Sequence, residues 1–357
     1  MEHGMLPPAV REAAEELIAA GHVPGLVVAA ARAGGPVETL ALGTDGAGAP
    51  LAPETLFPVA SVTKLATALA ALRLVDQGRV GLDDELARLL PEAAAARPGV
   101  TLRSLLCHTS GLPLDVPAEA APYAEGLDWR RLAEACAQTP LEAEPWSRVQ
   151  YSNVGYGLVA LLVERLTGQG FVAALRELVL EPLGVEGYLG QEPPRPPAVL
   201  ADVRGPQRGT PIEPFNSPFW RSLALPWAGL VTTAAGALAL VRAYLAAPGG
   251  LLGDALREEA VSDQTRGLSG GFVAPLRWSP SPWGLGPEVR GDKSPHWVPR
   301  EAGPDSFGHS GASGALAWAA PQHGVAWVIL GARTADGGWL LRRSGAVSAA
   351  VLAASAE

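Results

Sequence analysis

The sequence has little positive charge, and this scarcity excludes several classes of partner. Only 18% of the 357 residues are charged, and 27 basic residues stand against 36 acidic ones, for a net charge of −9. No block of basic residues occurs anywhere in the chain. Nucleic acids and anionic membrane surfaces need clustered Lys and Arg to displace counterions. Neither is therefore expected as a partner, and a small-molecule substrate is expected instead.

Cysteine and long apolar runs are scarce as well. The two cysteines, Cys107 and Cys136, lack the spacing of metal ligands and are predicted to be reduced core residues. The N-terminal segment carries Glu2 and has neither the basic stretch nor the uninterrupted apolar stretch of a signal peptide. The longest apolar runs, such as 158–163, are far shorter than the roughly 20 residues that span a bilayer. These absences predict a cytoplasmic protein.

Strand patterns occur near both ends of the chain, and helical patterns lie between them. The strands are expected at 24–34, 36–43, 315–321 and 324–333, and the helices at 8–20, 61–77, 101–107, 128–138, 153–167, 170–179, 233–246 and 339–354. Residues 268–308 are rich in Gly, Pro and Trp and are expected to form loops or irregular strands.

The simplest arrangement of these elements is an α+β fold with more than one domain. An antiparallel sheet built from both termini is flanked by helices and forms one domain from residues 1–57 and 290–357. Residues 58–289 form an inserted, mainly helical domain, and the active site is expected at the interface of the two.

Lysine and asparagine are rare, with two of each, and one of each occurs in a motif that can carry chemistry. Ser61 and Lys64 stand three residues apart at the start of the predicted helix 61–77, on one helical face. A buried lysine can lose its proton and act as a base toward the serine, which an arginine cannot do. The N–H of Ser61 is also available to an oxyanion. The structural alternative is that Ser61 caps the helix and Lys64 is an ordinary helical residue.

Two further motifs complete the candidate site. Tyr151 precedes a predicted helix and can relay a proton, and the amide of Asn153 can orient the lysine or the substrate. Before the strand at 315, His309 presents a polar or partly cationic group, Gly311 lets substrate approach the backbone, and Ala312 offers a second N–H to the oxyanion. The structural alternatives are a helix cap at 152–153 and a plain turn at 309–312.

These motifs and their order resemble the serine β-lactamase and penicillin-binding-protein superfamily, in the branch of class C β-lactamases, D-alanyl-D-alanine carboxypeptidases and family VIII carboxylesterases. Supporting segments extend over nearly the whole chain, and they include LFPVASVTKLATALAALRLVDQG, VTLRSLLCHTSGLP, PWSRVQYSNVGYG and FGHSGASGALAWAAP. The resemblance implies Ser61 as the acylated nucleophile, Lys64 as the base and Tyr151 as its partner. It also implies a substrate contact at Asn153, an oxyanion hole from the N–H groups of Ser61 and Ala312, and no metal or cofactor.

The third motif departs from the family pattern, because many relatives begin it with a lysine that holds a substrate carboxylate. This chain has His309 there, which favours neutral esters. We therefore expect a serine hydrolase that cleaves short-chain carboxylic esters, with weak β-lactam hydrolysis as a side activity. The alternatives are a β-lactamase or D-amino-acid peptidase with the same groups, which the lack of an export signal disfavours, and an inactive binding protein of the same fold.

Other motifs are expected to be structural. Ser269 lies in a G-x-S-x-G pattern but lacks the strand before it and the helix after it that such a nucleophile requires. His108 lies in an apparent turn after a short helix. Trp278, Trp283 and Trp297 are expected to pack among loops, with an aromatic wall over the substrate pocket as the alternative.

Overall fold

The computed structural model describes residues 6–246, 250–272 and 276–355. Within them the helices are α1 (Pro8–Ala19), α2 (Thr63–Asp76), α3 (Leu86–Leu89), α4 (Leu102–Leu106), α5 (Trp129–Gln138), α6 (Asn153–Thr167), α7 (Phe171–Leu175), α8 (Pro218–Ser222), α9 (Ala234–Arg242), α10 (Asp254–Val261), α11 (Trp339–Arg342) and α12 (Gly345–Ser355). Short 3-10 turns are η1 (Ala60–Val62), η3 (Arg300–Ala302), η4 (Pro321–His323) and η5 (Ala335–Gly337), and η2 (Arg176–Leu180) is π-helical.

The strands form one large sheet and two small ones. They are β1 (Gly25–Arg32), β2 (Glu38–Gly43), β3 (Phe57–Pro58), β4 (Val149–Gln150), β5 (Gly187–Tyr188), β6 (Val231–Thr232), β7 (Gly270–Gly271), β8 (Arg277–Trp278), β9 (Glu288–Val289), β10 (Phe307–Gly311), β11 (Ala315–Ala320) and β12 (Val325–Gly331). The large sheet is antiparallel in the order β2-β1-β12-β11-β10-β9, and the small sheets are β3-β6-β5 and β4-β7-β8. The predicted α+β class, with a sheet built from both ends of the chain, is confirmed.

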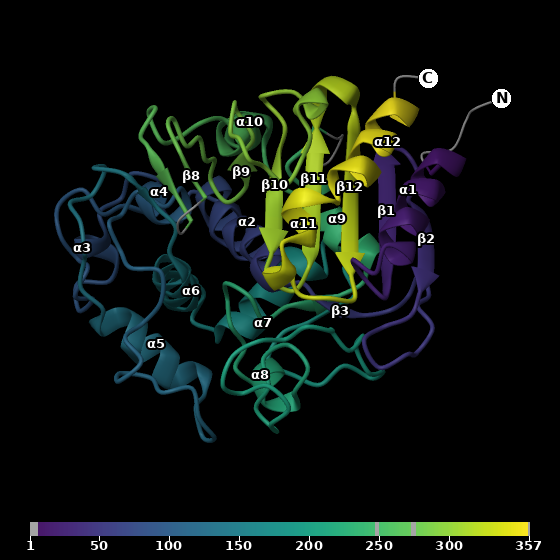
Figure 1. Cartoon of the computed structure of the whole chain (residues 1–357). Coiled ribbons are helices and arrows are strands. Elements are labelled where there is room, and N and C mark those ends of the chain that lie inside the picture. Colours follow the sequence, from purple (N-terminus) through teal and green to yellow (C-terminus); the bar gives the residue numbers. More distant parts are fainter. Residues whose placement is uncertain (1–5, 247–249, 273–275, 356–357) are drawn as a thin grey trace.

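Both faces of the large sheet are buried. On β1, Leu26 and Val28 pack with α1 and α12, whereas Val27 and Ala29 face α9 and the helical part. Figure 1 shows α1, α11 and α12 over one face of the sheet and α9 behind the other. This alternation explains why β1 reads as a continuous apolar run in the sequence.

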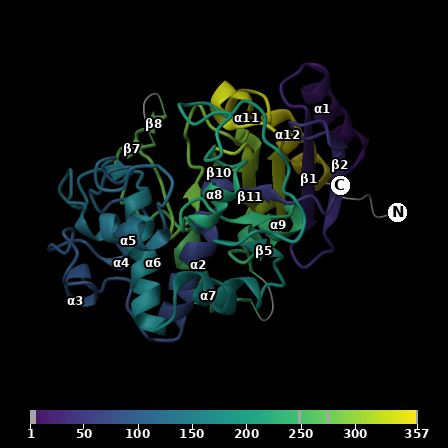
Figure 2. The same ribbon diagram turned by 90° about the horizontal axis from the view of Figure 1, so that it is seen from below.

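Helix α2 is the central element and lies between the sheet and the other helices (Figures 1 and 2). It packs on α6 and α7 on one side and on α9 and β10 on the other, and its side chains are buried nearly all round. Helix α6 in turn contacts α4 and α5. The residues at the start of α2 are therefore held at the boundary between the sheet and the helices. The division of the chain at residues 57 and 290 stays a prediction.

Two predicted elements differ in the structure. The helix expected over 339–354 is interrupted, because Arg343 leaves the helical region at φ −129° and α12 begins again after Ser344. The segment before residue 309, expected to be irregular, forms β10, which pairs with β11 and β9.

No single helix in the described ranges has the length and apolar character needed to cross a membrane. One pair, Asn153–Thr167 with Phe171–Leu180, reaches that length and apolarity only when taken together, across an 83° bend.

Candidate active site

Ser61 lies in the 3-10 turn η1, directly before α2. The preceding residue, Ala60, has φ 44°, a left-handed conformation that is strained for a residue with a side chain and that clusters at functional sites. The N-cap residue of α2 is Val62, and no side chain caps this helix. The interpretation of Ser61 as the N-cap is thus wrong, because the serine lies one residue further upstream within the turn. Its side chain is half-buried and faces Lys64.

Lys64 is fully buried and is held by three polar groups. Its Nζ lies 3.3 Å from Ser61 Oγ, 2.7 Å from Asn153 Oδ1 and 3.0 Å from the carbonyl oxygen of Trp227. Burial lowers the pKa of Lys64 well below its ordinary value, and the nearby carboxylate of Asp115 opposes this only in part. Burial thus favours the neutral form of this amine.

Asn153 connects this cluster to a residue that the sequence analysis missed. The side-chain Oδ1 of Asn153 accepts from Lys64, and its Nδ2 donates to Asp115 Oδ1 over 2.6 Å. The backbone N–H of Asn153 donates to the carbonyl oxygen of Leu114, and Ser152 is the residue that caps α6. Asn153 thus has a fixed amide orientation, with its carbonyl oxygen toward the amine.

Tyr151 lies on the other side of the amine. Lys64 Nζ is 4.6 Å from the centre of the Tyr151 ring, which is packed between His108 at 4.5 Å and Phe272 at 4.4 Å. Burial raises the pKa of Tyr151, and the nearby hydroxyl of Ser61 lowers it by a smaller amount. Yet the Tyr151 hydroxyl has no hydrogen-bond partner of standard geometry among the described residues. A protonated phenol with free hydrogen-bonding capacity therefore stands beside the serine.

The end of strand β10 closes the site from the sheet side. A Cβ at Gly311 would lie 2.4 Å from the carbonyl oxygen of Val59, so only glycine lets β10 approach the turn before Ser61 this closely. Ala312 follows at an exposed position. In the described part of the chain, no turn or loop hydrogen bond uses the N–H of Ser61 or of Ala312.

His309 differs from the expectation of a partly cationic group. Its ring is fully buried, and Nδ1–H donates to the carbonyl oxygen of Ser310 over 2.6 Å. Burial and the neighbouring Lys64 lower the pKa of His309 to about 3, so the imidazole is neutral near pH 7.

The motifs expected to be structural have structural surroundings. The Ser269 hydroxyl lies 2.7 Å from that of Ser279, and the short strand β7 follows it instead of a helix. His108 Nδ1 accepts from the N–H of Ser152 over 3.1 Å, behind the Tyr151 ring. Cys107 and Cys136 are free and buried. Among the residues with described positions, no three His, Cys, Asp or Glu side chains gather as a metal ion would require.

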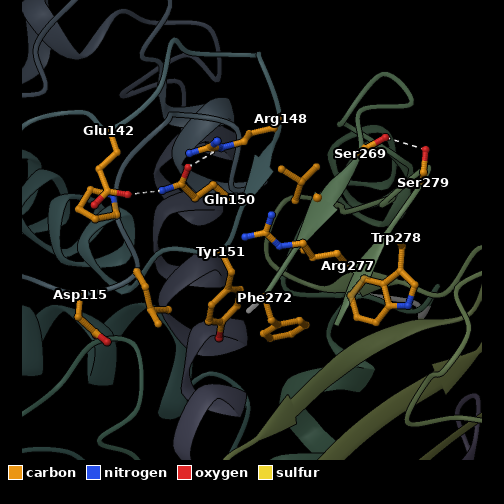
Figure 3. A pocket seen from close by; sticks show the side chains of 15 residues that line it. Asp115, Glu142, Arg148, Gln150, Tyr151, Ser269, Phe272, Arg277, Trp278 and Ser279 are labelled. Carbon is orange, nitrogen blue, oxygen red and sulfur yellow. Dashed lines mark hydrogen bonds between the residues drawn. The ribbon is translucent and has the colours of Figure 1, made fainter. Parts of the chain in front are cut away.

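A cavity of about 850 Å³ opens beside Tyr151 (Figure 3). Ser61 and Lys64 are not among its lining residues, whereas Tyr151 and Asp115, the carboxylate bonded to Asn153, both line it. Of the tryptophans, Trp278 lines the cavity, Trp283 packs behind Tyr151, and Trp297 packs on the large sheet. Trp278 and Phe272 thus contribute aromatic rings to the cavity lining, while Trp283 and Trp297 pack elsewhere; a wall of the three tryptophans over a substrate pocket stays a prediction.

Comparisons with known proteins identify the family of this chain. The model of the family described as Beta-lactamase matches residues 10–344. Penicillin-binding protein 4 of Amycolatopsis lactamdurans is 30% identical over 82% of this chain and 76% of its own length. Esterase EstB of Burkholderia gladioli is 34% identical over 63% of this chain and 67% of its own. The solved structure of a penicillin-binding-protein homologue from Caulobacter crescentus superposes with a TM-score of 0.75 at 28% identity, covering 97% of each chain.

Proposed function

This chain belongs to the Beta-lactamase family of serine hydrolases, and from that premise we propose that it cleaves short-chain carboxylic esters through an acyl-enzyme on Ser61. One observation carries the proposal. A fully buried lysine with a lowered pKa lies 3.3 Å from the hydroxyl of a half-buried serine, and no carboxylate among the described residues bonds to that lysine. Such an amine is a suitable general base for a serine nucleophile.

The three partners of Lys64 suit its neutral form. A neutral amine has two hydrogens and one lone pair. The hydrogens go to Asn153 Oδ1 and to the carbonyl oxygen of Trp227, which only accept. The lone pair then faces Ser61 Oγ and takes its proton as the oxygen attacks the ester carbonyl.

The N–H groups of Ser61 and Ala312 stabilise the negative charge that develops on the carbonyl oxygen. Gly311 brings the end of β10 against the turn that contains Ser61, which supports this pairing. Donors fixed before the reaction need no reorganisation as the charge forms.

Tyr151 returns the proton to the leaving group. Because its pKa is raised, the phenol is protonated at neutral pH and serves as a donor rather than as a base. Its proton passes to the departing alkoxide, and the protonated Lys64 replaces it, so the C–O bond breaks without a net change in charge. Water then attacks the acyl-enzyme and Lys64 takes the water's proton. As the acyl–Oγ bond breaks, Lys64 returns this proton to Ser61 Oγ, and both groups regain their starting forms.

Ester cleavage is favoured over β-lactam or peptide cleavage by the neutral state of His309. Many relatives hold a substrate carboxylate with a lysine at the position of His309, and a neutral buried imidazole does not supply that charge. The similarity to esterase EstB points in the same direction. The similarity to penicillin-binding protein 4 keeps a β-lactamase or D-amino-acid peptidase as the second candidate.

The test compares hydrolysis of p-nitrophenyl butyrate and of nitrocefin by the unchanged protein and by Ser61→Ala. We expect fast ester cleavage and slow or absent nitrocefin cleavage, both lost in Ser61→Ala, with a circular dichroism spectrum that does not change. Fast nitrocefin cleavage with poor ester cleavage would assign the second candidate. If neither substrate is cleaved, a fluorophosphonate probe that fails to label Ser61 would identify an inactive binding protein.

A further inference from the structure

The cavity beside Tyr151 offers a place for the leaving group, and this inference rests on the proposed function. The hydroxyl that protonates the departing oxygen must lie next to it, so the leaving group extends from Ser61 toward Tyr151. Tyr151 forms part of the wall of the 850 Å³ cavity. What lines the rest of this cavity therefore selects the alcohol part of the ester.

The small sheet β4-β7-β8 builds one wall of the cavity and aligns three residues across its strands. Gln150 pairs with Gly271, and Gly271 pairs with Arg277. Paired residues of neighbouring strands project from the same face of a sheet, so Gln150 and Arg277 stand on either side of a glycine. Gly271 has φ +142°, and a Cβ there would lie 2.6 Å from the carbonyl oxygen of Leu276. The Cβ would also lie 3.0 Å from the Trp278 ring, so the backbone and this ring require glycine between the two side chains.

The polar groups around this gap are paired, with one exception. Arg148 Nε donates to Gln150 Oε1 over 2.8 Å, and Gln150 Nε2 donates to Glu142 Oε2 over 2.8 Å. Asp115 accepts from the amide of Asn153. Arg277 is exposed and has no ion pair or side-chain hydrogen bond with any residue that the structure describes.

Figure 3 shows the direction of this arginine. The guanidinium of Arg277 points into the cavity, toward the strand that carries Gln150 and Tyr151, while Glu142 and Asp115 lie on the other side of the view. The rings of Phe272 and Trp278, 6.1 Å apart and nearly perpendicular, add an apolar wall. A cation and aromatic rings therefore line the same cavity, with Trp278 on the opposite face of β8 from Arg277.

We propose that Arg277 binds a carboxylate on the alcohol part of the substrate, so that the preferred substrates are esters of aromatic hydroxy acids. The planar fork of a guanidinium matches the two oxygens of a carboxylate, and the aromatic rings contact the ring that bears it. His309 carries no charge, so the anionic group is recognised on the β8 side of the site. The second arginine, Arg148, is held by Gln150 and adds positive potential at the same wall.

The test uses two esters that differ in this charge and in one methyl group, 4-butyryloxybenzoate and its methyl ester. We expect Arg277→Ala to lower kcat/KM about tenfold for the anionic ester and to leave the neutral ester unchanged, as expected for loss of a hydrogen bond to a charged group. Arg277→Lys, which keeps the charge without the fork, should lose less. Arg130→Ala, at an exposed position on α5 outside the cavity, is the matched control and should change neither ester. An equal effect of Arg277→Ala on both esters, or none, overturns the proposal.

A binding measurement separates failure of this proposal from failure of the proposed function. Calorimetry of 4-hydroxybenzoate, the expected product, with Ser61→Ala needs no turnover. If neither ester is cleaved, the esterase assignment fails, but binding that weakens about tenfold on adding Arg277→Ala still supports the subsite. Absent binding, or binding that Arg277→Ala leaves unchanged, contradicts the subsite whatever the enzyme hydrolyses.

Discussion

The two lysines of this chain are both fully buried, and their surroundings differ in one respect. Lys64 is bonded to a hydroxyl, a side-chain carbonyl and a main-chain carbonyl, from Ser61, Asn153 and Trp227. Lys293 is bonded to two main-chain carbonyls and to the carboxylate of Glu288, at 2.8 Å. Among the described residues, no carboxylate is in direct contact with Lys64, whereas the carboxylate of Glu288 is in direct contact with Lys293.

This difference sets the protonation state of each amine. Burial lowers the pKa of both lysines, more strongly for Lys64, while at Lys293 the charge and hydrogen bond of Glu288 work against it. Burial acts to raise the pKa of Glu288, but the charges of Lys293 and His296 bring it down to about 2. Lys293 and Glu288 thus form an ion pair, and Lys64 is the amine poised to lose its proton.

The comparison shows that burial alone does not make a lysine a base. The contacting partner decides whether a buried amine stabilises the fold or takes part in chemistry. Substitution of Lys64 is therefore expected to remove activity and leave the fold intact. Substitution of Lys293 is expected to destabilise the fold and leave the activity of the folded protein.

The largest expected effect comes from Lys64→Met. It removes the base, and turnover of p-nitrophenyl butyrate should fall by about 10⁴-fold or more, the scale found when one member of a catalytic unit is lost. The protein should stay folded. Folding lowers the pKa of Lys64 below its unfolded value of about 10.4, so the free energy of unfolding decreases as the pH falls from about 10.4 to the folded pKa. Replacement of Lys64 by Met removes this destabilising contribution. The measurements are the ester assay and urea unfolding at pH 7. Substantial activity in folded Lys64→Met would show that another group acts as the base.

Lys293→Met should have the reverse profile. It removes the amine bonded to the buried Glu288 carboxylate and leaves His296, 3.5 Å away, as the neighbouring basic group, which costs about 3 kcal/mol in the free energy of unfolding, the lower end for a broken buried pair. The ester-cleaving activity of the remaining folded protein should persist. Lys293→Met combined with Glu288→Leu should recover most of the stability, because well-packed apolar residues can replace a buried pair. Unchanged stability in the single variant would remove the contrast between the two lysines.

Much of the fold follows from local sequence patterns. The apolar runs at 25–32, 315–320 and 325–331 form strands as predicted, and the helix that begins after Ser61 is present. Strand β10 escaped prediction because Gly308, His309, Ser310 and Gly311 have low strand propensity, and it is pairing with β11 that makes them a strand. Pairing with a neighbouring strand therefore determines the structure of this segment more than its local sequence does.

The candidate site was predictable only where its members stand close in sequence. Ser61, in the 3-10 turn η1, and Lys64, in the first turn of α2, stand three residues apart, which a spacing rule detects. The carbonyl of Trp227 and the carboxylate of Asp115 were missed, because they reach Lys64 and Asn153 through tertiary contacts that no local pattern encodes. The neutral state of His309 was likewise not predictable, since it depends on complete burial of the ring beside Lys64.

The central claim is that Lys64 carries a lowered pKa while Lys293 is held in an ion pair, and one measurement tests it directly. Protein labelled with ¹³C at the lysine ε-carbon should give two folded-state signals, because the chain has two lysines, and Lys293→Met assigns them. We predict that the Lys64 signal titrates at the lower pH, well below about 10.4, and that the Lys293 signal titrates later. A Lys64 signal that titrates together with or after that of Lys293 would contradict the account.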